Sequence, residues 1–211
     1  MIALLLLFIA ASGLLTITPG VDTALVLRTS TVDGPLAGAK ASLGICLGLL
    51  AWGASAAFGL TALLAASALA FNIVKWAGAA YLVYLGAKLI LKPRTLLAKS
   101  NEAVGNLGRS RGTRGAYQRG FLSNILNPKV GVFYVTFLPQ FIPHGVNVAA
   151  FSLLLAGIHV LITLTWFSLL IALTVPLGRF LSKPRVVRNL DRVTGCVFVG
   201  FGLRLAVAKR A

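Results

Sequence analysis

Long apolar runs follow one another along almost the whole chain and leave little room for a soluble fold. Hydrophobic residues make up 58% of the 211 residues and charged residues only 11%, against about 25% charged residues in an ordinary soluble domain. A run of about twenty apolar residues can cross a bilayer as a helix, which satisfies its backbone hydrogen bonds internally. The sequence therefore predicts an all-α membrane protein. We expect about six transmembrane helices, at approximately Ile2–Leu27, Ala39–Ala65, Phe71–Leu91, Gly120–Phe141, Val148–Leu173 and Val193–Val207.

The first apolar segment is interrupted at Thr18-Pro19-Gly20-Val21-Asp22. Pro19 has no N–H to donate to the carbonyl of Leu15, and Gly20 adds backbone freedom. Asp22 places a carboxylate where it costs roughly 2.5–3.5 kcal/mol near the centre of a membrane helix. Freed backbone groups and a charge are tolerated there only where they face protein or a water-filled cavity. We therefore expect this break to line a site. The alternative is a tolerated kink with Asp22 near the membrane surface.

The fourth segment carries a second break, in which Asn124 and Asn127 precede Pro128 and Lys129. Pro128 frees the carbonyl of Asn124 as Pro19 frees that of Leu15. Lys129 lies about ten residues, or roughly 15 Å at 1.5 Å per residue, inside the charged end of the segment. Its long side chain can reach part of that distance toward the membrane surface. The other interpretation is a buried cation that faces the cavity and pairs with Asp22 or with a substrate carboxylate.

The two halves of the chain look alike, since each begins with a segment broken at a proline. The third segments share a pattern: Gly78 followed by Gly86-Ala87-Lys88-Leu89, against Gly195 followed by Gly202-Leu203-Arg204-Leu205. Three segments per half would make the second copy enter the membrane from the opposite side, and such inverted repeats are common in transporters. Chance similarity among apolar helices is the alternative. We expect a single transmembrane transporter domain over 1–211, with halves at about 1–92 and 118–211 joined by a basic loop at about 93–117.

Basic residues greatly outnumber acidic ones, with twenty Lys and Arg against four Asp and Glu and a formal charge of +16. In a soluble protein this excess of basic residues would indicate nucleic-acid binding. Here the basic residues lie between apolar runs, so the membrane explains them better. Cytoplasmic loops collect Lys and Arg. Fifteen of the twenty lie at or near the first, third and fifth connections, which we therefore expect in the cytoplasm with both termini outside. If the first segment failed to cross, five spans would result. The other side holds four: Lys75, Arg204, Lys209 and Arg210.

Few other residues inside the segments carry chemistry. His159 lies near the middle of the fifth segment with Thr163 one turn further on, so His159 is a candidate for proton transfer beside Asp22, or a structural histidine. Cys46 and Cys196 both lie inside apolar runs and indicate no disulfide framework. The sequence has no P-loop, no set of Cys and His ligands and no Ser-His-Asp arrangement. We expect neither an enzyme nor a cofactor or metal.

With these residues assembled, the chain resembles the LysE/RhtB family of bacterial amino-acid exporters. The resemblance implies a secondary exporter of amino acids or close derivatives in the inner membrane, driven by proton antiport. Where the family usually has Pro-Gly-Pro, this chain has Pro19-Gly20-Val21, which starts the second half-helix less rigidly. The resemblance rests on Thr18–Asp22, Gly38–Gly48, Ala77–Gly86, Gly120–Lys129 and Phe137–Phe141.

The substrate is expected at the two breaks, where half-helix termini suit the carboxylate and ammonium of a zwitterion. Two other classes compete. A membrane redox carrier would need cysteines beside the breaks, and an ion or metal exporter would need several intramembrane carboxylates or histidines. The expected partners are an amino-acid substrate, protons and the lipid bilayer, without nucleic acid, and a homo-oligomer is left open. The expected substrate-binding residues are Pro19, Gly20, Asp22, Asn124, Asn127, Pro128 and Lys129, with Asp22 and His159 as candidates for proton coupling.

Overall fold

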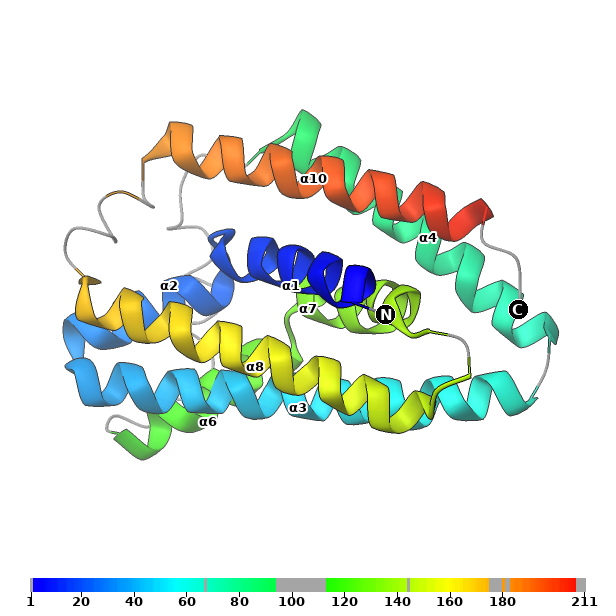
Figure 1. Ribbon diagram of the computed structural model, residues 1–211. Helices are drawn as coiled ribbons and strands as arrows, with labels where there is room; N and C mark the ends of the chain where they lie inside the picture. The colour runs from blue at the N-terminus through cyan, green and yellow to red at the C-terminus, as the bar shows by residue number, and fades with distance from the viewer. Residues whose placement is uncertain are drawn as a thin grey trace.

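The fold is a bundle of long helices, in which two of the chain's segments are broken into shorter pieces (Figure 1). The computed structural model describes residues 2–66, 68–93, 113–143, 145–174, 180 and 183–207. Residues 94–112 of the basic loop expected at about 93–117 lie outside these residues, and residues 113–117 belong to a helix. The helices are α1 (Ile2–Ile17), α2 (Val21–Val32), α3 (Pro35–Ala66), α4 (Ala68–Leu91), α6 (Thr113–Ile125), α7 (Pro128–Val132), the π-helix η1 (Phe133–Phe137), the 3-10 helix η2 (Leu138–Phe141), α8 (Val148–Ala172) and α10 (Pro184–Val207).

The apolar character expected of a membrane protein is confirmed in the described helices. Two are long and apolar enough to cross a membrane, over Pro35–Gly59 of α3 and Val148–Ala172 of α8. A third candidate is the pair α1 and α2, which together meet the same criteria but are bent by 53° at the break between them. A shorter apolar helix covers Trp76–Leu91. The all-helical membrane class therefore holds for the part of the chain that the structure describes.

Several helices extend beyond the segment ends expected from hydropathy. Charged residues mark the expected ends, but a helix can continue wherever its charged side chains reach outward. At the start of α10, Arg188 and Arg192 are exposed while Val187 and Asp191 are buried. The expected ends are corrected as follows: α2 continues to Val32 rather than Leu27, α6 begins at Thr113 rather than Gly120, and α10 begins at Pro184 rather than Val193.

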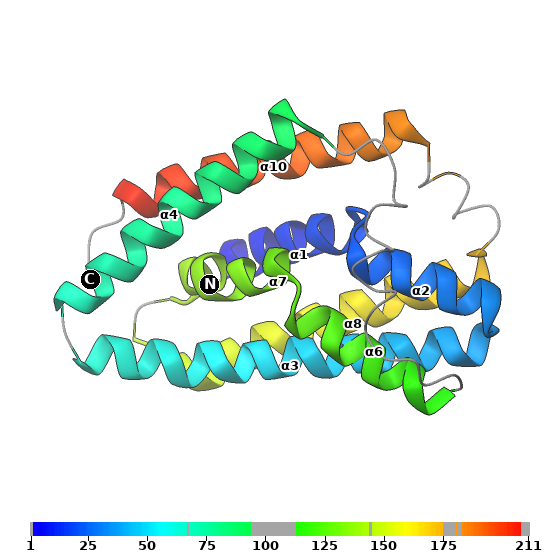
Figure 2. The ribbon, with the colours of Figure 1, turned by 180° about the vertical axis from the view of Figure 1, so that it is seen from behind.

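Helix packing separates the bundle into two groups that enclose α1. Helix α3 packs along both α6 and α8, while α4 packs along α10. In both views α1 lies between these two groups (Figures 1 and 2). The close approaches depend on glycine, which lets helix backbones come near each other. A Cβ at Gly44 of α3 would overlap the Tyr117 carbonyl of α6, and a Cβ at Gly86 of α4 would lie 2.6 Å from the Gly195 carbonyl of α10.

Aromatic rings fill the core on one side of the breaks. Phe8 of α1 packs against Phe133 of η1 and Phe141 of η2, with ring centroids 5.9 and 5.4 Å apart, and all three rings are fully buried. Phe137 stacks against Phe133 and also contacts Phe201 of α10. This cluster fixes α1 against the fourth segment and thereby sets the position of the two breaks relative to each other.

Candidate functional site

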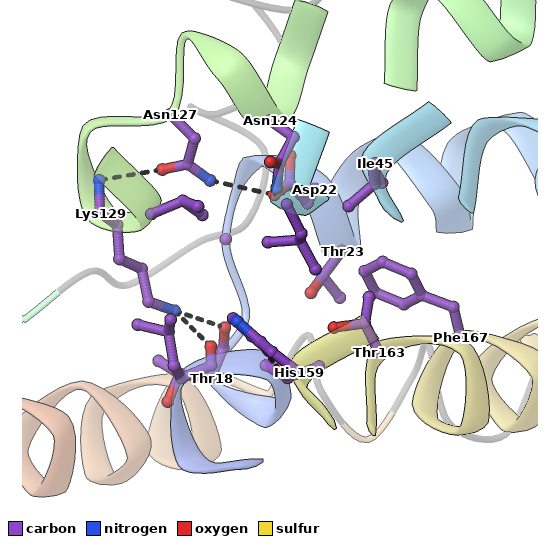
Figure 3. Close-up of a pocket in the computed structure, with 15 residues that line it drawn as sticks. Thr18, Asp22, Thr23, Ile45, Asn124, Asn127, Lys129, His159, Thr163 and Phe167 are labelled. Atoms are coloured by element: carbon purple, nitrogen blue, oxygen red, sulfur yellow. Dashed lines mark hydrogen bonds between the residues drawn. The ribbon is translucent and has the colours of Figure 1, made fainter. Parts of the chain in front are cut away.

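The two breaks meet at one cavity, together with α3 and α8 (Figure 3). The cavity has a volume of about 40 Å³, and since one buried water needs about 10–15 Å³, there is room for a few waters. None of the described residues of α4 and α10 is among the lining residues. The lining residues are Leu15, Thr16, Thr18, Gly20, Asp22, Thr23, Ile45, Leu49, Asn124, Asn127, Lys129, Val130, His159, Thr163 and Phe167.

The first break places Asp22 at the start of a new helix. The last turn of α1 closes with the Thr18 N–H donating to the Leu14 carbonyl, and the next intrahelical bond runs from the Ala24 N–H to the Gly20 carbonyl. Gly20 is the N-cap of α2, in an extended conformation and without a side chain to cap the helix. Asp22 is the second residue of α2, where the exposed N–H groups and the helix dipole favour a carboxylate.

The second break has the same layout but ends in a cation. Asn127 is the N-cap of α7, and its side-chain Oδ1 accepts from the Lys129 N–H at 3.1 Å. Pro128 occupies the first helical position, where its missing N–H has no intrahelical partner to lose. Lys129 is therefore the second residue of α7, as Asp22 is the second residue of α2. The chain places opposite charges at equivalent positions of the two breaks.

The Asp22 carboxylate accepts hydrogen bonds from the other broken segment. Ser123 donates to Oδ1 at 2.7 Å, while the side-chain amides of Asn124 and Asn127 donate to Oδ2 at 2.9 and 3.2 Å. Ser123 and Asn124 are only 2% and 1% exposed. Three donors to one partly buried carboxylate compensate for much of the hydration that it loses.

The Lys129 ammonium reaches across in the opposite direction, to the end of α1. It donates to the carbonyl of Leu15 at 2.7 Å and to that of Thr18 at 3.1 Å (Figure 3). Pro19 leaves the Leu15 carbonyl without its helical donor, as the sequence predicted, and a cation is favoured beside the C-terminal carbonyls of a helix.

His159 lies on the same cavity, held from both ring nitrogens. Its Nε2 lies 3.2 Å from Thr16 Oγ1, and its Nδ1 lies 3.2 Å from the Tyr134 hydroxyl. The ring stacks on Tyr134 with centroids 5.7 Å apart. These contacts join α1, η1 and α8 at the cavity and hold the imidazole in one orientation.

The structure brings together most of the residues singled out in the sequence, and adds some that sequence reasoning missed. Pro19 and Pro128 form the breaks but do not line the cavity. Ser123, Thr16 and Tyr134 were not anticipated, although a polar Ser123 directly before Asn124 in an apolar segment was a usable signal. Gly20, Asp22, Asn124, Asn127, Lys129 and His159 all line the cavity.

Comparison with known proteins gives a consistent result over nearly the whole chain. The family described as LysE type translocator matches residues 13–209. The membrane protein YrhP of Bacillus subtilis (strain 168) is 34% identical, over 97% of this chain and 99% of its own length. A leucine efflux protein of Enterobacter sp. (strain 638) is 30% identical over 94% of this chain and 93% of its own.

A second leucine efflux protein, from Salmonella choleraesuis (strain SC-B67), is 29% identical over 94% of this chain and 92% of its own. No solved structure matches the chain. The matches cover both breaks, α3 and α8, and therefore every element that lines the cavity. The chain belongs to the LysE type translocator family.

Proposed function

We propose that this protein is a secondary transporter that exports amino acids or close derivatives across the bacterial inner membrane by proton antiport. The observation that carries the proposal is the meeting of Asp22 and Lys129, from two broken helices, at one cavity. The chain's family supports translocation, and two relatives named leucine efflux proteins support an amino acid as the cargo.

The cavity offers a partner for each end of a zwitterion. A substrate carboxylate would pair with the Lys129 ammonium, and a substrate ammonium would pair with the Asp22 carboxylate and the carbonyls of Leu15 and Thr18. Each of these groups is now held by the protein itself. The substrate would therefore exchange partners with the protein, and the exchange keeps charged groups paired throughout. Because the cavity has room for only a few waters, binding must also widen it.

Proton coupling is assigned to Asp22, with His159 as the second candidate. A proton on Asp22 would remove the charge that holds the substrate ammonium and so would favour release. His159 lines the same cavity and bonds Thr16 and Tyr134, so a change in its protonation would alter contacts of both α1 and η1.

The broken segments also support the proposed architecture. We assign the whole chain to one transmembrane transporter domain with six spans, built from two inverted repeats of about 1–92 and 118–211. In each repeat a broken first helix is followed by a long apolar helix, α3 or α8, and by a third helix, α4 or α10, and these third helices pack on each other. The basic loop at about 93–117 is assigned to the cytoplasm.

An efflux assay tests the proposal directly. Cells that make the protein are loaded with dipeptides, which release amino acids inside, and the medium is analysed over time for a panel that begins with leucine. Cells that do not make the protein serve as the control. We expect faster efflux of at least one amino acid, and faster still with a larger inward proton gradient. Equal efflux of every amino acid from both cell types would refute the function.

A further inference from the structure

One hydroxyl on the cavity has no partner in the structure. Thr163 is 2% exposed, and its Oγ1 is buried without a hydrogen bond. Several other threonines of the described helices donate back to the carbonyl four residues earlier. Thr165 of the same helix does so to Leu161 at 2.8 Å, and Thr16 of α1 does so to Ser12 at 2.7 Å. The Thr163 hydroxyl makes no such bond, and a buried hydroxyl without a partner is destabilising.

This hydroxyl lies at the end of the cavity away from Lys129. Figure 3 shows Lys129 and Thr18 on one side, Asp22 between, and Ile45, Thr163 and Phe167 on the other side. A zwitterion bound between Lys129 and Asp22 would extend its side chain toward this second side.

The lining charges limit what that side chain can be. Among the lining residues, Asp22 is the one carboxylate and Lys129 the one ammonium, so they match the two charges of an amino acid's main chain. The third titratable lining group, His159, is held at both ring nitrogens by Thr16 and Tyr134. A third charge on the substrate side chain would therefore be buried without a counterion, which is strongly unfavourable. The second side offers instead the apolar surfaces of Ile45 and Phe167 and the hydroxyls of Thr23 and Thr163.

We propose that the side-chain pocket of the substrate site is formed by Thr23, Ile45, Thr163 and Phe167. This pocket accepts an uncharged side chain, and Thr163 determines whether a hydroxyl on that side chain is favoured. This inference rests on the proposed function. Thr163 bonds a substrate hydroxyl that replaces its missing partner. An aliphatic side chain of the same shape fits the walls but leaves the Thr163 hydroxyl unpaired.

Threonine and valine are the natural test pair, because they have nearly the same shape and differ by one hydroxyl. Purified protein in liposomes is assayed for uptake of each under an imposed proton gradient, and for competition between them. The wild-type protein should prefer threonine by about three- to tenfold, the range expected for one net hydrogen bond. Thr163→Val should reduce this preference to about one or below, while Thr163→Ser should keep it.

Thr165→Val is the matched control, since it removes a hydroxyl from the same helix outside the cavity and should leave the preference unchanged. Equal transport of threonine and valine by the wild-type protein would overturn the inference while leaving amino-acid export intact. This comparison needs no variant. An unchanged preference in Thr163→Val, or transport of lysine as fast as valine, would overturn it as well. Transport of no amino acid at all would refute the proposed function itself.

Discussion

The Lys129 ammonium donates to the Leu15 carbonyl at 2.7 Å, across 114 positions of the chain. That carbonyl is the one that Pro19 leaves without a helical donor. The Asp22 carboxylate makes the converse connection, since it accepts from Ser123, Asn124 and Asn127 of the other broken segment. Each broken segment therefore binds the charged side chain that follows the break in the other.

Removal of either charge should stop transport. Asp22→Asn and Lys129→Gln should each lower efflux by about a hundredfold or more, because loss of one member leaves buried polar groups of the other break uncompensated. The double variant should be no worse than the worse single one, since members of one unit are strongly non-additive. Efflux rates are normalised to the amount of protein in the membrane.

The matched controls for these charges are exposed residues of the same type. Lys88 is exposed on α4, and Asp33 forms a partly exposed ion pair with Arg119 at 3.4 Å. Lys88→Gln and Asp33→Asn should therefore keep near wild-type efflux. An ion pair at the surface, such as Asp33 with Arg119, contributes only about 0–1 kcal/mol to stability. Near wild-type efflux from Asp22→Asn or Lys129→Gln would show that the charge is peripheral and that the site depends on backbone groups.

A methyl group at Gly48 should disturb the site indirectly. A Cβ there would lie 2.6 Å from Oδ1 of Asn124, whose amide holds Asp22. Gly48→Ala should lower efflux severalfold and stability by about 1–3 kcal/mol through overpacking. At Gly59 of the same helix a Cβ would meet nothing within 4 Å, so Gly59→Ala should change neither efflux nor stability. Equal thermal stability and efflux in the two variants would contradict the packing described here.

The cysteines should be dispensable for transport. Cys46 is buried in α3, Cys196 is exposed on α10, both are free thiols, and neither lines the cavity. The variant with both changed to Ala should retain efflux within about twofold, because neither cysteine is among the cavity-lining residues. If Cys46→Ala and Cys196→Ala each lost activity, and Ser at the same positions did not restore it, the redox-carrier alternative would be favoured instead.

The orientation can be tested by labelling in that cysteine-free background. A cysteine at Ser110, in the basic stretch, should be protected from an impermeant thiol reagent in intact cells, because positively charged loops stay in the cytoplasm. A cysteine at Gly145, in the connection between the fourth and fifth segments, should react. Ready labelling at position 110 together with protection at 145 would reverse the topology.

The local features of this chain could be predicted from its sequence. Apolar runs specify membrane helices, and Pro19 and Pro128 specify breaks, because a missing N–H and a steric clash act within four residues of the proline. The freed Leu15 carbonyl followed from the same reasoning. The family assignment, predicted from the residues around both breaks, is confirmed. The assignment of a substrate site to those residues stays a prediction.

Only the tertiary structure decided how the two breaks are completed. The sequence allowed Lys129 to pair with Asp22 or to reach the membrane surface, whereas the folded chain turns its ammonium onto the end of α1. The roles assigned to Ser123 and to the unpartnered Thr163 hydroxyl likewise depend on neighbours that helix packing brings close. Hydropathy and proline positions report on one helix at a time. The partner of a buried polar group depends on which helices pack together, at what depth and in what rotation, and in this chain close contacts such as Gly44 against Tyr117 set those variables.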